Sequence, residues 1–172
     1  MIFLASNSSS KVTAARDNFS SLDLDPVLSE SLTNEEFVRR FQLTFDLLNQ
    51  RERESLLVLA DANKFNAGEA VLEAGIRSDQ LYLVLSGSVT MMHEELAATT
   101  LSVGDVFGES AFVRGDGELF SYVTAEETVL LAIDFSYLNK LVRINPYFER
   151  RLEPSLSELH AHKLDLFEAQ LC

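Results

Sequence analysis

Cysteine, histidine and basic residues are scarce in this sequence, and so are long apolar runs. The single cysteine, Cys172, cannot form a disulfide within the chain or supply a cysteine-based metal cluster. No apolar run approaches the roughly 20 residues that a membrane-spanning helix needs. The apolar start of the chain is short and has no basic residues before it, unlike a secretory signal. We therefore expect a cytoplasmic protein that does not act at a membrane and holds no cofactor or metal.

The shortage of positive charge bears on the kind of partner. The chain has 14 lysines and arginines against 27 aspartates and glutamates, a formal net charge of −13. Between Phe65 and Ile133 only Arg77 and Arg114 are basic, against eleven acidic residues, so this stretch carries 2 − 11 = −9. Nucleic acids favour proteins with a basic face, because neutralising phosphates releases counterions. The sequence therefore predicts no nucleic-acid partner.

The sequence contains little that is typical of a catalytic or metal-binding site. There are three histidines, and His160 and His162 are two positions apart, so on a helix they diverge and do not form an i, i+4 metal pair. We expect both on the polar surface. His93 alone lies in the glycine-containing middle of the chain, which disfavours a cupin-type metal site. Neither a G-x-S-x-G nor a G-x-x-x-x-G-K motif is present, and a non-enzymatic protein is expected.

Two helices are predicted before the middle of the chain. Residues 1–32 are rich in Ser, Asn and Asp, include Pro26 and show no period, which predicts a mobile N-terminal arm. Thr33 and Glu36 have capping-box spacing. A helical apolar pattern follows, formed by Phe37, Phe41, Phe45 and Leu48. A second helix is expected over residues 51–62, so that the helices occupy 33–62.

The residue pattern in the middle of the chain predicts a β domain. All seven glycines lie between Gly68 and Gly117, and short runs rich in Val, Leu, Tyr and Thr alternate with them. Strands of this length with turn signals between them predict an antiparallel sandwich or small barrel. We place this β core at residues 65–133.

Helical spacing returns over residues 134–171, with Asp134 as the predicted N-cap. The later apolar stripe contains Phe148, Leu152, Leu156, Leu159, Leu164, Phe167 and Leu171. Pro154 either kinks this helix or marks its start. The stripe is longer than cover for the β core requires, so it either packs on its own chain or forms a homodimer contact.

Five segments occur in the order and spacing of a known family: FNAGEAVLEAG (65–75), LYLVLSGSV (81–89), LSVGDVFGES (101–110), LLAID (130–134) and FSYLNKLVRINPYF (135–148). Together they resemble the cyclic-nucleotide-binding domain family, which includes cAMP receptors and the regulatory subunits of protein kinase A. The resemblance extends from about Leu47 to Leu164. It implies an α+β fold, an antiparallel β jelly roll flanked by N-terminal and C-terminal helices, with residues 33–172 as the domain.

The resemblance also implies a ligand pocket. A short helix after Phe-Gly-Glu would direct its free N–H groups toward a cyclic phosphate, here from Ser110 and Ala111, with Gly108 in the same pocket. Glu109 would accept a hydrogen bond from the ribose 2′-hydroxyl. An equally open interpretation makes Glu109 a capping carboxylate for that helix.

The sequence departs from the family at the arginine that pairs with the phosphate. Alignment on Val123-Thr124-Ala125 places Leu119 at that position, whereas a count from Glu109 places Glu118 there. Losing one partner of a desolvated charge pair costs on the order of 2–5 kcal/mol. Arg114 is the local candidate to replace it, and its other interpretation is an exposed loop residue near Asp116.

The neighbouring residues leave two further interpretations open. Leu119 or Phe120 could fill the pocket, or both could be ordinary strand residues beside Ser121. A filled pocket predicts a regulatory module that acts through a protein partner. The alternatives are a receptor for cAMP, cGMP or a cyclic dinucleotide, and a structural protein that dimerises through its last helix. The chain ends too soon after Leu164 for a helix-turn-helix, so direct action as a transcription factor is not expected.

Overall fold

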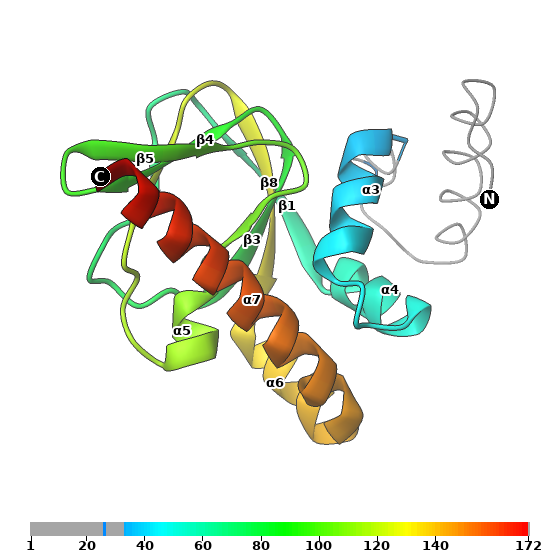
Figure 1. The fold of residues 1–172 in the computed structure, drawn as a ribbon. Helices are drawn as coiled ribbons and strands as arrows, with labels where there is room; N and C mark the ends of the chain where they lie inside the picture. Colours follow the sequence, from blue (N-terminus) through cyan, green and yellow to red (C-terminus); the bar gives the residue numbers. More distant parts are fainter. Residues whose placement is uncertain (1–25, 27–32, 172) are drawn as a thin grey trace.

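The computed structural model describes Pro26 and residues 33–171. Apart from Pro26, the predicted N-terminal arm of residues 1–32 lies outside the described residues. The centre of the described part is a set of eight strands (Figure 1). They are β1 (Ala60–Phe65), β2 (Ala70–Leu72), β3 (Gln80–Ser86), β4 (Val89–His93), β5 (Leu96–Leu101), β6 (Val106–Phe107), β7 (Ser121–Thr124) and β8 (Thr128–Asp134).

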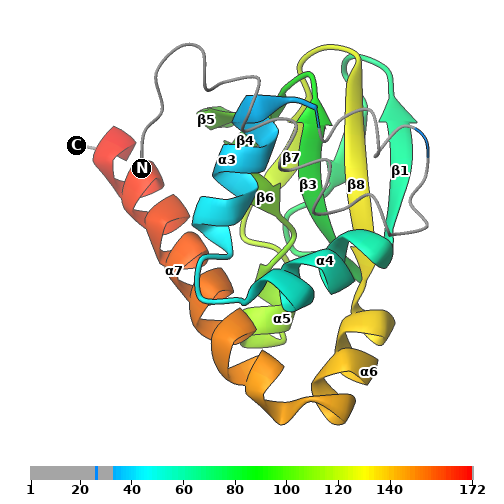
Figure 2. The ribbon, with the colours of Figure 1, turned by 90° about the vertical axis from the view of Figure 1, so that its right-hand side faces the viewer.

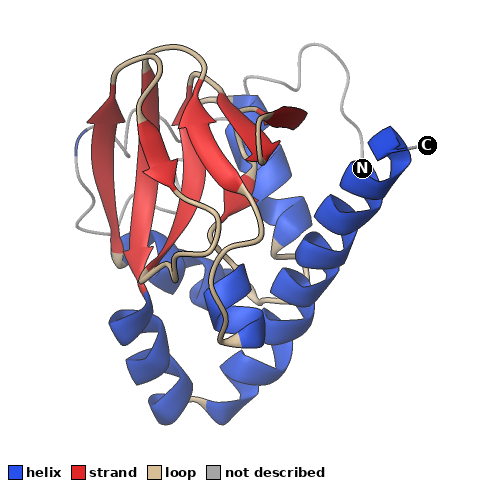
Figure 3. Cartoon of the chain, turned by 90° about the vertical axis from the view of Figure 1, so that its left-hand side faces the viewer, coloured by secondary structure: helices blue, strands red, loops and turns tan. Residues whose placement is uncertain are grey.

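The strands form two four-stranded sheets in which all neighbours are antiparallel. One sheet has the order β1-β8-β3-β6 and the other β2-β7-β4-β5. Apolar residues from both sheets meet in a buried cluster of Val84, Val89, Met91, Leu101, Phe107, Phe120, Tyr122 and Leu130. The predicted α+β fold, a jelly roll with flanking helices, is confirmed. The helices gather at one end of the strands and along one side of them (Figure 3).

Two N-terminal helices, α3 (Glu35–Thr44) and α4 (Gln50–Val58), precede the strands. The predicted apolar face of α3 and the turn after it is buried: Phe37, Phe41, Phe45 and Leu48. The cap of α3 is Asn34, not Thr33, because its side chain accepts hydrogen bonds from the amides of Glu36 and Phe37. A capping box does occur, on α4, between Asn49 and Glu52.

The boundary between the second helix and the β core differs from the prediction. Helix α4 ends at Val58, and β1 begins at Ala60, where a helix to residue 62 was expected. Ala60 pairs with Ile133 and Phe65 with Thr128 at the two ends of β1. Pairing with β8 satisfies the backbone of residues 60–62, and this long-range ladder outweighs the helical preference of two alanines.

Three helices follow β6, namely α5 (Ser110–Arg114), α6 (Phe135–Ile144) and α7 (Pro146–Leu171). Asp134 caps α6 as predicted, accepting a hydrogen bond from the Ser136 amide at 2.8 Å. Helix α7 begins at Pro146 and continues through Pro154. Over residues 33–171, no helix combines the length and apolar character that crossing a bilayer would require.

The long helix α7 packs on its own chain over most of its apolar stripe. Phe148, Leu152 and Leu156 are buried with the N-terminal helices, while Leu164 and Phe167 pack against the cluster between the sheets. Leu171 is exposed. Helix α7 therefore runs from α6, past α5, to the end of the barrel near β5 (Figures 1 and 2).

Candidate functional site

The turn after β6 places Glu109 in the interior. Gly108 has φ of 87°, and a Cβ atom there would lie 2.7 Å from the Gln80 carbonyl oxygen, so this position requires glycine. Glu109 comes next, at the start of α5, and its side chain makes no capping hydrogen bond to that helix. The carboxylate is fully buried. Its partners must therefore come from elsewhere in the fold.

Both partners of Glu109 come from α7. Lys163 Nζ donates a hydrogen bond to Oε2 at 2.8 Å, and His160 Nδ1 lies 3.2 Å from Oε1. All three side chains are buried, with relative exposures of 0% for Glu109, 6% for His160 and 2% for Lys163. Lys163 Nζ also lies 3.4 Å from the hydroxyl of Tyr122 on β7. The site thus joins the β6–α5 turn, β7 and the last helix.

The pKa of Glu109 results from opposing effects. Burial raises it most strongly, but the charge of Lys163 and the hydrogen bonds from His160 and Lys163 together hold it below its usual range. Glu109 is therefore a carboxylate at neutral pH. The turn that the resemblance assigned to a ligand is occupied by an internal ion pair.

Glu118 is a second buried acid beside the first. It is 2% exposed, and neither carboxyl oxygen has a hydrogen-bond partner within the described residues. Burial and the charge of Glu109 raise its pKa to about 7, against opposing effects of Ser110, Lys163 and His160. His160 Nε2 is likewise buried without a partner among those residues. The Glu118 carboxyl oxygens and His160 Nε2 are therefore buried polar atoms whose hydrogen bonding is not satisfied within the described residues.

Aromatic rings occupy the part of the site toward the end of α7. Phe120 is 1% exposed, and its ring centre lies 5.4 Å from that of Phe167 on α7. The His93 ring on β4 lies 4.7 Å from Phe167 and 6.1 Å from Phe120. On the other side, Phe107 stacks on Tyr122 at 4.6 Å. All of these contacts bury apolar area, and those of Phe167 hold α7 against the barrel.

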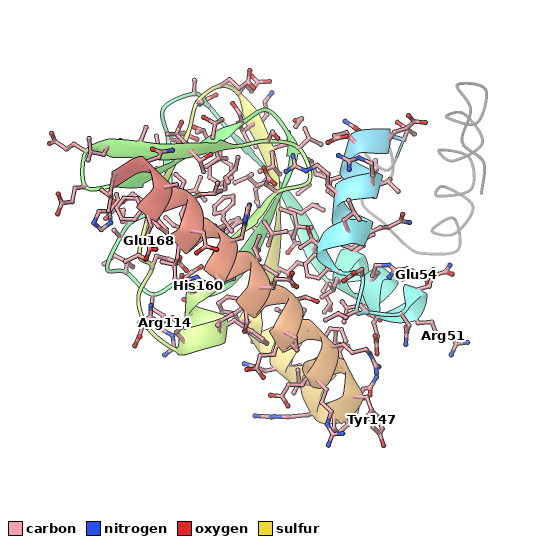
Figure 4. The ribbon with its side chains drawn as sticks, in the orientation of Figure 1. Arg51, Glu54, Arg114, Tyr147, His160 and Glu168 are labelled. Carbon is pink, nitrogen blue, oxygen red and sulfur yellow. The ribbon has the colours of Figure 1, made fainter. Side chains whose placement is uncertain are left out.

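The predicted site residues divide into those around Glu109 and those away from it. Gly108, Ser110 and Ala111 lie with Glu109 in the buried turn. Arg114, at the end of α5, lies apart from them, because its half-exposed side chain pairs with Asp116 at 3.2 Å (Figure 4).

The remaining predicted residues lie on the approach to β7 and at its start. Leu119 is half-buried, and its carbonyl oxygen lies 3.4 Å from His93 Nδ1. Ser121 is half-buried as well, and its hydroxyl accepts from the Ala74 amide at 3.0 Å. Of the two positions aligned with the family's arginine, Glu118 is therefore the one that lies beside Glu109.

Sequence reasoning missed two residues of the site. His160 was expected on the surface with His162, but only His162 is exposed, and His160 faces Glu109. Lys163 was not singled out. The available signal was their spacing, since Leu156, His160, Lys163 and Phe167 recur at three and four residues and share one face of a helix. Polar residues that continue an apolar stripe indicate a buried polar contact.

Comparison with known proteins agrees with the fold. Residues 62–145 match the family model described as cyclic nucleotide-binding domain. The cAMP-activated global transcriptional regulator of Pasteurella multocida is 28% identical over 102 residues, which is 55% of this chain and 48% of that protein. The chain spans at most about half the length of the curated relatives it matches.

Solved structures show the same fold. A cyclic nucleotide-binding domain from Methylobacillus flagellatus is similar with a TM-score of 0.64 and 17% identity, over 77% of this chain and 83% of that one. The catabolite activator protein of Thermus thermophilus has a TM-score of 0.61 and 26% identity, over 74% and 61% of the two chains. Residues 62–145 therefore match the cyclic nucleotide-binding domain family, and the fold is the one found in its solved structures.

Proposed function

We propose that this protein is a non-enzymatic regulatory module in which α7 occupies the nucleotide pocket and regulation proceeds through protein contacts. The observation that carries the proposal is the state of Glu109, which is fully buried, paired with the charge of Lys163 and in contact with His160 of the same chain. A regulatory role agrees with the family, whose members include the cAMP-activated regulator of Pasteurella multocida.

A ribose would have to compete with α7 for Glu109. Each carboxylate oxygen already has a neighbour on α7, at 3.2 Å from His160 and 2.8 Å from Lys163. Separating a buried ion pair so that one charge is left unpaired costs about 3–5 kcal/mol. At about 1.4 kcal/mol per tenfold change, this cost lowers affinity by two to four orders of magnitude.

A cyclic phosphate would find little positive charge. Glu118, one of the two positions that the resemblance aligns with the family's arginine, lies beside Glu109, and Arg114 pairs with Asp116. Lys163 is the buried cation of the site, and it is committed to Glu109. A negatively charged ligand would therefore be placed near two acidic side chains.

The test is titration calorimetry of the full chain with cAMP, cGMP and cyclic di-GMP. We expect no saturable binding of any of the three in the micromolar range. Micromolar binding would overturn the proposal. If Arg114→Ala abolished that binding while Arg77→Ala, at an exposed arginine elsewhere in the β core, left it unchanged, the protein would instead be a small-ligand receptor that uses Arg114.

A further inference from the structure

We infer that the junction of α6 and α7 is a docking surface for an acidic segment of a partner protein that carries an aromatic or aliphatic anchor. Six exposed side chains define this surface, called here the α6–α7 corner: Tyr137, Lys140, Arg143, Ile144, Tyr147 and Arg150. The α6–α7 corner would provide the protein contact that the proposed function requires, and the inference rests on the proposed function in that respect.

The corner exposes three large apolar side chains. Ile144 is 82% exposed, Tyr147 63% and Tyr137 42%. Tyr137, Lys140 and Ile144 are three and four residues apart on α6, so they share one face, and Tyr147 follows in the first turn of α7. Tyr147 projects from the lower end of the molecule in Figure 4. Exposed tyrosine and aliphatic side chains on consecutive helical turns are typical of protein interfaces.

The charge of the corner is opposite to that of the chain. Between Phe135 and Arg151, four basic residues oppose one acidic residue, Glu149, which gives 4 − 1 = +3, whereas the whole chain carries −13. Arg151 is committed to Glu52 of α4. Lys140, Arg143 and Arg150 remain on the surface, so the corner complements an acidic partner.

Two basic side chains at the corner lie over tyrosine rings. Lys140 Nζ lies 5.3 Å from the centre of the Tyr137 ring, and the Arg150 guanidinium lies 5.6 Å from the centre of the Tyr147 ring. Such contacts orient a long basic side chain over an apolar surface. A partner carboxylate could therefore meet an ordered cation beside an apolar ring. This pairing favours an acidic segment with an apolar anchor over a purely acidic one.

The corner is separate from the buried ion pair of the pocket. Tyr147 and Lys163 are sixteen positions apart on α7, or about 24 Å along a helix. Nucleotide titration therefore tests the pocket alone, and a binding assay at the corner tests this surface alone. Failure of one proposal can be told from failure of the other.

The experiment measures fluorescence anisotropy of labelled poly(glutamate-tyrosine) copolymer against the full chain, with labelled polyglutamate as the probe that lacks the anchor. We expect saturable binding of the copolymer and markedly weaker binding of polyglutamate. The double variant Ile144→Ser/Tyr147→Ser, or Lys140→Glu/Arg143→Glu, should weaken copolymer binding about tenfold or more, as loss of an interface anchor does. Leu96→Ser and Arg77→Glu, exposed residues elsewhere, serve as matched controls and should leave it unchanged.

Three results would overturn the inference. The first is equal binding of the two polymers, or binding that the corner variants do not weaken. The second is preferential binding to phosphatidylserine vesicles over phosphatidylcholine vesicles through the same residues, which would make the corner a membrane-binding surface. The third is concentration-dependent dimerisation in light scattering that Ile144→Ser abolishes, which would make the occupant a second copy of this chain.

Discussion

Lys163 and Glu109 are both almost completely buried and lie 2.8 Å apart. A buried ion pair stabilises a fold only while both partners are present, because the charge left behind by a substitution has no access to water. We expect Lys163→Met to lower the free energy of unfolding by about 3–5 kcal/mol. Urea denaturation of the full chain measures this change.

Two control variants, one at Glu109 and one at His162, test whether this loss comes from the unpaired charge. Adding Glu109→Gln to Lys163→Met removes the orphaned charge, so the double variant should recover a large part of the loss. His162→Met, at an exposed position one residue before Lys163, should change stability by no more than about 0.5 kcal/mol. A Lys163→Met variant as stable as His162→Met would contradict this view of the pair.

Glu118 gives the site a dependence on pH. Its pKa is raised from 4.5 to about 7 in the folded protein, by burial first and then by Glu109. Between these two values the folded chain binds a proton that the unfolded chain does not bind, so stability falls as pH rises through this window. The slope approaches about 1.4 kcal/mol per pH unit and disappears above the folded pKa.

Unfolding of Glu118→Gln across pH tests this dependence. The wild-type chain should match the variant near pH 4.5 and become less stable than it as pH rises to about 7. The exposed Glu73→Gln should not change the pH profile. A constant difference between wild type and Glu118→Gln across the window would rule out a raised pKa for Glu118.

At the scale of elements, α4 and α7 are joined by one ion pair. Arg151 on α7 donates to Glu52 on α4, with Nε at 3.0 Å from Oε2, and Glu52 also completes the capping box of its own helix. Hydrogen bonding to Arg151 is the main cause that lowers the pKa of Glu52. The contribution of Glu52 to stability is therefore present above its unfolded pKa of 4.5 and is lost as pH falls through the folded value.

We expect Arg151→Ala to lower the urea midpoint of unfolding by less than loss of a fully buried pair would, because Arg151 is one-third exposed. Amide exchange should accelerate in α4, since its tie to α7 is removed. The adjacent, exposed Arg150→Ala is the control and should leave α4 protection unchanged. Unchanged exchange in α4 of Arg151→Ala would show that apolar packing alone holds the helix.

Local signals identified most elements and misplaced some boundaries. Asp134 was recognisable as a cap because a carboxylate can accept from the amide two residues on. The start of β1 at Ala60 could not be recognised, because its strand conformation depends on pairing with β8, about seventy residues later in the chain. Secondary-structure propensity depends on a residue and its near neighbours, so it does not predict a strand that forms by pairing with a distant one.

Over the whole molecule, opposite charges occupy different regions. The stretch from Phe65 to Ile133 carries −9, while that from Phe135 to Arg151 carries +3. The helices gather at one end of the sheets, which separates the α6–α7 corner from much of the acidic barrel (Figure 3). Separation of this kind gives a partner a direction of approach as well as a surface.

The sequence by itself determined the elements and the family. Hydrophobic periods, glycine turns and caps depend on residues a few positions apart, and the five family-like segments are local runs. The site was decided by the tertiary structure, because His160 and Lys163 are 51 and 54 positions from Glu109. Only the course of α7 across the barrel brings them to that carboxylate. Burial, in turn, decides whether a charge needs a partner, and burial is a property of the folded chain.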